Sequence, residues 1–120
     1  MDDWEAHTAY EGGVTAASPL VRWFWSAVRA MTADDRSALL HFCTGRARAP
    51  PLGFATLMGY GGEQHRFTLQ GLPPSARLPT ASTCFNTLKL PEYSSAAELA
   101  AKLRQSLGES TGFHEGAVAM

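Results

Sequence analysis

Two cysteines, Cys43 and Cys84, are the candidates for covalent chemistry in this sequence of 120 residues. A thiolate is a strong nucleophile, and it is favoured where the side chain is partly exposed and close to hydrogen-bond donors. Cys84 fits this description, because it follows polar Ser82 and Thr83 in a segment that Pro79 marks as an exposed loop. Backbone N–H groups of such a loop could also stabilise an oxyanion in acyl transfer. The local sequence therefore makes Cys84 a candidate nucleophile.

Cys43 fits the common alternative, in which a lone intracellular cysteine acts as a small buried hydrophobe. It follows Leu39 and Leu40 on the apolar stripe of a predicted helix, so we interpret it as a core residue. Two cysteines are too few for a disulfide framework. Neither they nor the four histidines have the spacing of a zinc site. We therefore expect free thiols, no bound metal and no cofactor.

The charge balance argues against several classes of partner. Ten basic and eleven acidic residues give a net charge of -1, whereas nucleic-acid and membrane-surface modules normally carry a basic excess. No apolar run is long enough to span a membrane, and the acidic start of the chain is unlike a signal peptide. We therefore expect neither nucleic acid nor membrane as a partner, and a reducing cytoplasmic or nuclear location.

Two helices are predicted in the first half of the chain. Ser18 can cap the first helix, with Pro19 at its first position. Apolar residues then recur at helical spacing: Leu20, Trp23, Phe24, Ala27, Val28 and Met31. Thr32 can cap a second helix, and Gly45 can end it. Because the connection between them is so short, we expect the two helices to pack as a hairpin.

The middle of the chain is predicted to form a small sheet. Residues 2–17 are expected to be a short helical turn and a loop, and residues 46–53 a second loop. Short strands are predicted over residues 54–58, 66–70 and 85–90, with a surface loop over 71–81. Cys84 would then lie where a loop leads into the third strand. Loops on a rigid scaffold often carry functional side chains.

A closing helix is predicted after residue 95. Ser95 and Glu98 have the spacing of a capping box, and Leu99, Leu103 and Leu107 form an apolar stripe. Gly108 should end this helix and leave residues 109–120 as a mobile tail. The predicted fold is a single α+β domain over residues 1–120, with two leading helices, a sheet of three to four strands and one closing helix. The apolar share of 45% suits one globular domain of this length.

The sequence also contains a series of recognisable blocks. In chain order these are WFW at 23–25, LLHFCTG at 39–45, RAP at 48–50, LP at 78–79, TCFN at 83–86, LPEYSS at 90–95 and GF at 112–113. In this order and spacing they resemble the C-terminal lobe of the HECT-type ubiquitin-protein ligases. The resemblance covers nearly the whole chain, and residues 78–86 match the family signature LPxxxTCFN.

The resemblance implies a specific reaction. Cys84 would take ubiquitin from a ubiquitin-conjugating enzyme as a thioester, and would then pass it to a lysine of a protein substrate. Thr83 and Phe85 would shape the loop that presents the thiol, and Asn86 would fix the turn through its side-chain amide. Phe113 resembles the family's tail phenylalanine, which implies a part in docking the tail.

The sequence departs from the family pattern in two places. Ser82 stands where many members carry a histidine, and seven residues follow Phe113. The resemblance also implies that the larger N-lobe, which recruits the conjugating enzyme, lies outside this chain. Full activity is therefore expected to require that lobe.

Two other functions remain open on the sequence. The first is a non-catalytic module that binds ubiquitin or another partner without forming a thioester, which the serine at position 82 motivates. The second is an unrelated thiol enzyme such as a cysteine peptidase, which needs a histidine base beside the thiol. No sequence signature places any histidine there; the four are His7, His41, His65 and His114.

Overall fold

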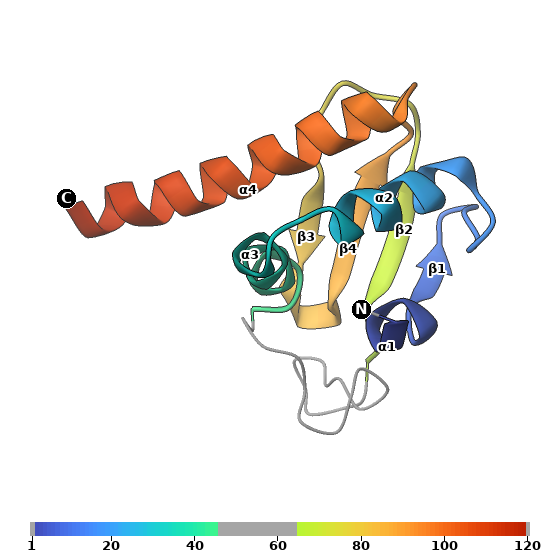
Figure 1. The fold of residues 1–120 in the computed structure, drawn as a ribbon, viewed down its shortest axis with the longest axis horizontal. Coiled ribbons are helices and arrows are strands. Elements are labelled where there is room, and N and C mark those ends of the chain that lie inside the picture. Colours follow the sequence, from blue (N-terminus) through green and yellow to red (C-terminus); the bar gives the residue numbers. More distant parts are fainter. Residues whose placement is uncertain (1, 46–64, 120) are drawn as a thin grey trace.

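The computed structural model describes the backbone of residues 2–45 and 65–119, with side chains described for residues 3–45 and 65–108. Figure 1 shows helices gathered over one face of a small sheet. The elements in chain order are α1 (Asp2–Ala6), β1 (Ala9–Glu11), α2 (Pro19–Arg29), α3 (Ala33–Thr44), β2 (Thr68–Leu72), β3 (Thr80–Ser82), the 3-10 turn η2 (Thr83–Phe85), β4 (Thr87–Pro91) and α4 (Ala96–Ala119). The α+β class is confirmed.

Helix α2 begins at Pro19, as predicted, but Ser18 does not cap it with its side chain. The Ser18 hydroxyl instead accepts a hydrogen bond of 2.9 Å from the Thr15 N–H, within the preceding loop. The buried face of α2 is also wider than predicted, because it includes Val21 and Trp25. In Figure 1 the helix crosses in front of the sheet, and it packs against α4 beside it.

Four aromatic rings join α1 and α2 to the start of the sheet. Trp4 and Trp25 pack edge to face at 5.6 Å, and Trp4 meets Phe67 in the same way at 5.2 Å. Phe24 stacks on Phe67 at 6.4 Å, and both of these side chains are fully buried. Because such pairs add to the free energy gained by burial, this cluster fixes α2 against the residue that leads into β2.

Helix α3 has both predicted ends. The Thr32 hydroxyl accepts a hydrogen bond from the Asp35 N–H at 3.1 Å. Gly45 takes the left-handed conformation, with φ of 77°, and its N–H donates to the His41 carbonyl at 2.8 Å. A left-handed residue after the last turn is a common helix end, and glycine adopts it without steric cost.

The predicted hairpin of α2 and α3 is wrong. The two helices cross at a wide angle (Figure 1), and each packs against α4 instead. The Arg36 guanidinium explains the wide angle between α2 and α3. It donates to the carbonyls of Val28 and Arg29 at 3.0 and 2.7 Å. These bonds go to carbonyl groups in the last turn of α2, where Val28 also accepts from the Met31 N–H at 3.1 Å, and they hold α3 across that end.

The sheet has the strand order β1-β2-β4-β3. Strands β1, β2 and β4 are parallel, and β3 pairs antiparallel with β4. The register pairs Leu69 with Leu88, and both are fully buried. Neighbouring positions Gln70 and Lys89 are paired one step further along and are only half-buried. Side chains alternate between the two faces of a strand, so one face meets the helices and the other is polar.

Several strand boundaries differ from the prediction. The strand predicted over 66–70 is β2 at 68–72, and the strand predicted over 85–90 is β4 at 87–91, because residues 83–85 form the η2 turn. The expected loops over 2–17 and 71–81 contain β1 and β3. Strands of three residues are too short to show an alternating pattern. The strand predicted over 54–58 lies outside the described residues.

Helix α4 has the predicted start and a different end. The Ser95 hydroxyl accepts from the Glu98 N–H at 3.1 Å, while the Glu98 carboxylate accepts from the Ser94 N–H at 2.8 Å. The predicted stripe of Leu99, Leu103 and Leu107 is buried. The predicted stop at Gly108 is wrong, because the helix runs on through the expected tail to Ala119. A single glycine costs a helix only about 1 kcal/mol, and no proline follows it.

In the described part of the chain, no helix is both long and apolar enough to cross a membrane.

Candidate active site

Cys84 lies on the η2 turn, which links β3 to β4 at one end of the sheet. Its side chain is exposed, whereas Cys43 on α3 is fully buried against the core. The prediction that Cys43 is a core residue is confirmed. Cys84 sits in a single 3-10 turn between two antiparallel strands, a more constrained setting than the loop that was expected.

Asn86 anchors the turn to the start of β2. It takes the left-handed conformation, with φ of 50° and ψ of 39°, and only 1% of its surface is exposed. Its side-chain amide donates to the His65 carbonyl at 2.8 Å. Its own carbonyl accepts from the Thr68 N–H at 2.9 Å. Asparagine tolerates this backbone conformation better than most residues, so the position of the turn relative to β2 depends on this side chain.

Three of the other residues proposed for the site, Ser82, Thr83 and Phe85, adjoin Cys84 along the chain. Thr83 and Phe85 are the neighbours of Cys84 on the turn, and Phe85 is 58% exposed, which is unusual for a large apolar side chain. Ser82 ends β3 opposite Thr87. The C-terminal end of α3 supports the turn from one side, since a Cβ atom built on Gly45 would lie 4.0 Å from the Thr83 Cβ. Phe113 falls within α4, and its side chain lies outside the described part of the structure.

His65 reaches this site, although no feature of the sequence placed it there. Its ring lies 5.8 Å from the ring of Phe85, centroid to centroid, and its carbonyl receives the Asn86 amide. Its Nδ1 is 3.0 Å from the Arg66 carbonyl. A carbonyl oxygen can only accept, so Nδ1 is the donor in this hydrogen bond. Among the described residues, no hydrogen bond joins an imidazole to the Cys84 thiol.

The two thiols differ in their electrostatic setting. Burial raises the pKa of Cys43, because an apolar surrounding disfavours the thiolate. Cys84 is exposed to solvent. Among the residues that the structure describes, no three His, Cys, Asp or Glu side chains gather in a way that could hold a metal ion.

Alkylation should distinguish the two cysteines. In the native protein, iodoacetamide is expected to modify Cys84 about 100-fold faster than Cys43, because only an accessible thiolate reacts. Intact mass and peptide mapping should show a single adduct on Cys84, and two adducts after unfolding in guanidinium. Equal labelling of Cys43 in the native state would contradict the burial of that side chain.

The sequence of the whole chain is similar to those of one known family. The model of the family described as HECT-domain (ubiquitin-transferase) matches residues 1–115. The chain is 42% identical over 113 residues to the human E3 ubiquitin-protein ligase NEDD4, which covers 94% of this chain and 8% of that protein. It is 44% identical over 106 residues to the zebrafish (Danio rerio) ligase HACE1, covering 88% of this chain and 12% of that protein.

A fission-yeast relative is also similar. The E3 ubiquitin-protein ligase pub3 of Schizosaccharomyces pombe is 39% identical over 113 residues, which covers 94% of this chain and 14% of that protein. The chain thus spans only a small part of the length of these relatives. Because the family match extends over nearly all of its residues, the chain belongs to the HECT-domain (ubiquitin-transferase) family.

Proposed function

We propose that this chain is a ubiquitin-transfer lobe in which Cys84 carries ubiquitin as a thioester. The observation that supports this most directly is an exposed thiol on a turn that hydrogen bonds hold to the start of β2. Cys84 is open to solvent, while Asn86 and the end of β2 hold its turn in place. A nucleophile that two large proteins must reach in succession needs this combination of exposure and fixed position.

The reaction has two steps. In the first, the Cys84 thiolate attacks the thioester carbonyl carbon that links ubiquitin to the conjugating enzyme; a new C–S bond forms, and the enzyme's thiolate leaves. In the second, a neutral lysine amine attacks the new thioester, an isopeptide C–N bond forms, and the Cys84 thiolate leaves. The amine loses a proton, and the thiol can take one up. Covalent catalysis of this kind divides one transfer into two easier steps.

The surroundings of the thiol offer three further features for these steps. The exposed ring of Phe85 provides an apolar contact beside the thiol for an incoming protein. The imidazole ring of His65 lies on the Phe85 side of the turn, 5.8 Å from the Phe85 ring, centroid to centroid. Ser82 and Thr83 supply hydroxyl groups immediately before the thiol.

The partners and the location follow from this reaction. Ubiquitin would be the covalent partner, and lysines of protein substrates would be the acceptors. The conjugating enzyme would be recruited by an N-lobe outside the 120 residues of this chain. A reducing cytoplasm or nucleus would keep the Cys84 thiol free for charging.

A charging assay tests the proposal. The chain is incubated with ubiquitin-activating enzyme, a charged conjugating enzyme and ubiquitin, at high chain concentration and with the N-lobe of a HECT ligase fused upstream in a parallel sample. A non-reducing gel should show a product one ubiquitin heavier, which reductant removes. Cys84→Ala should abolish this band, and Cys43→Ala should retain it. A reductant-sensitive band in Cys84→Ala would refute the assignment of the carrier.

The same assay separates the alternative functions. The absence of any band, even with the N-lobe fused, would favour a non-catalytic binding module, which the serine at position 82 motivates. The peptidase alternative is weakened by the site itself, because no described histidine is hydrogen-bonded to Cys84. The assay therefore decides between transfer and binding.

A further inference from the structure

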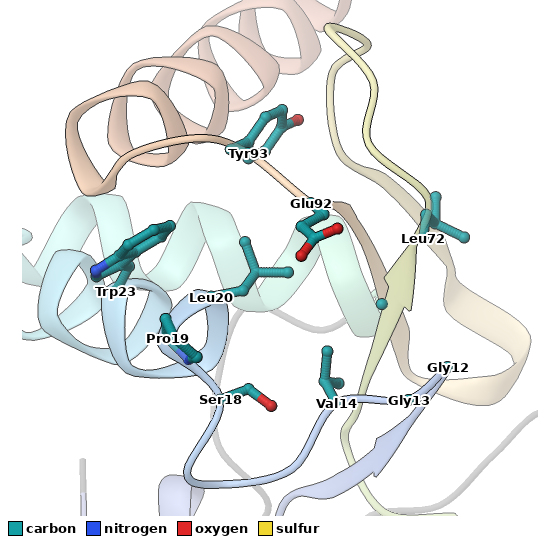
Figure 2. Close-up of a pocket in the computed structure, with 11 residues that line it drawn as sticks. Gly12, Gly13, Val14, Ser18, Pro19, Leu20, Trp23, Leu72, Glu92 and Tyr93 are labelled. Carbon is teal, nitrogen blue, oxygen red and sulfur yellow. The ribbon is translucent and has the colours of Figure 1, made fainter.

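A cavity lies at the opposite end of β4 from Cys84. It has a volume of about 410 Å³ and opens between the loop at residues 12–14, the first turn of α2, the end of β2 and the residues that follow β4 (Figure 2). Pockets for small ligands begin at about 300 Å³, so this one could hold a single long side chain. None of the residues assigned to the Cys84 site lines it.

The wall of this cavity is preformed by the backbone. Gly12 has a φ of 72°, and a Cβ atom on it would lie 2.2 Å from the Gly71 carbonyl oxygen. A Cβ atom on Gly71 would in turn lie 2.7 Å from the Val14 Cγ1. The loop therefore lies so close to β2 that only glycine fits at both positions. Hydrogen bonds between Thr15 and Ser18 hold the other end of the loop.

The lining combines apolar walls, an aromatic ring and one carboxylate. Val14, Leu20 and Leu72 provide apolar surface. Figure 2 shows the Trp23 indole on the α2 side and the Glu92 carboxylate on the opposite side, directed into the space between them. Among the described residues, Glu92 forms no ion pair.

Tyr93 closes the cavity beside Glu92 without adding charge. Burial, and after it the nearby Glu98 carboxylate, raises the pKa of Tyr93 to about 12, so the phenol stays neutral. Its hydroxyl donates to the Arg77 carbonyl. Neither Arg22 on α2 nor Arg77 lines the cavity. The positive end of the α2 dipole also lies here, but it amounts to about half a charge against the full charge of Glu92.

We propose that this cavity binds an arginine side chain presented by a partner protein. The apolar walls suit the methylene stem of arginine, which long cationic side chains commonly bury. The guanidinium can lie on the Trp23 ring and pair with the Glu92 carboxylate, since arginine stacks on aromatic rings and forms directed hydrogen bonds with carboxylates. The negative charge of the cavity and its planar aromatic surface select this side chain over neutral or acidic ones.

The position of the cavity separates docking from chemistry. The five residues of β4 span about 17 Å at roughly 3.3 Å per residue. A partner held by its arginine at this end would leave the Cys84 thiol free at the other. Binding would raise the local concentration of that partner near the thiol. The inference does not depend on thioester formation, so Cys84→Ala should bind arginine as well as the unchanged chain does.

A nuclear magnetic resonance titration tests the proposal. N-acetyl-arginine-methylamide is added to the 15N-labelled chain, and N-acetyl-citrulline-methylamide serves as the neutral probe of matched shape. The arginine probe is expected to shift the amides of Gly12, Gly13 and Gly71 and the indole N–H of Trp23 saturably, with a Kd on the order of 1 mM. Citrulline should bind at least about fivefold more weakly, because it lacks the charge.

Matched variants identify the residues responsible. Glu92→Gln should weaken arginine binding about fivefold. Glu11→Gln removes the same charge from a residue that is exposed like Glu92 but lies outside the cavity, and it should change binding less than twofold. Trp23→Leu should also weaken binding while keeping an apolar residue at the site. Equal binding of citrulline, equal effects of the two glutamate variants, or an absence of saturable shifts would each overturn the proposal.

Discussion

Replacing Cys84 by serine is expected to turn the transfer lobe into a trap. In a fusion with the N-lobe of a HECT ligase, Cys84→Ser should accept ubiquitin slowly as an oxyester that survives reductant, and multiple turnover should fall by at least about 1,000-fold. A hydroxyl is a far weaker nucleophile than a thiolate, and an oxyester reacts more slowly with amines than a thioester. Because Cys84 is exposed on its turn, exchanging one atom should leave the fold unchanged.

The measurement follows a single round of transfer to free lysine. The unchanged protein should discharge ubiquitin to lysine and lose its adduct in reductant. The Cys84→Ser adduct should resist both treatments and yield only to hydroxide. A reductant-sensitive adduct in this variant would show that another thiol carries ubiquitin.

Cys43→Ser is the matched control, because it makes the same exchange at the buried cysteine. A hydroxyl placed in the core without a partner should cost about 1–3 kcal/mol of unfolding free energy. Charging should nevertheless continue at any temperature where the variant is folded. The two serine variants thus separate a loss of chemistry from a loss of stability.

The helices that could be predicted from sequence are those with local signals. Their caps join residues within one helical turn of each other. Examples are the Thr32 cap of α3, the bond from the Gly45 N–H at its other end, and the Ser95–Glu98 bond of α4. Both partners of such a contact stand within a few residues of each other in the sequence, so the contact can be predicted locally. The stripe of leucines on α4 likewise identified its buried side, and each of those leucines lies in the core.

The features that could not be predicted depend on contacts between distant residues. Strands β1 and β3 have three residues each, and they exist because β2 and β4 offer them edges to pair with. The orientation of α3 depends on Arg36, whose guanidinium bonds to carbonyls at the end of α2. An arginine within a helix gives no sign in the sequence that it will do this.

The candidate site shows the same division. Cys84 stood out in the sequence through its motif and its polar neighbours, and Cys43 through its apolar stripe. His65 did not, because it is 19 residues from Cys84 in the chain and meets the turn only through the parallel pairing of β2 with β4. The left-handed conformation of Asn86 was also not evident, since asparagine is compatible with many turns.

Replacing Asn86 by alanine is expected to lower both the stability of the lobe and the rate at which Cys84 is charged. Asn86→Ala removes the amide that donates to the His65 carbonyl and places a Cβ-bearing residue at a φ of 50°. An unsatisfied buried acceptor costs about 1–3 kcal/mol, and the left-handed conformation costs alanine about 1 kcal/mol more. The unfolding free energy, measured by urea denaturation, should therefore fall by about 2–4 kcal/mol, with slower charging of the molecules that remain folded.

Two further variants divide this effect between the backbone and the amide. Asn86→Gly keeps the backbone conformation accessible and loses only the amide, so it should be more stable than Asn86→Ala by about 1 kcal/mol. Asn86→Asp keeps the shape of the side chain but replaces the donor with an acceptor facing the His65 carbonyl. It should be at least as unstable as Asn86→Gly and should charge more slowly. If Asn86→Asp unfolds and charges like the unchanged chain, the bond to His65 does not hold the turn, and the thiol is presented by the strands alone.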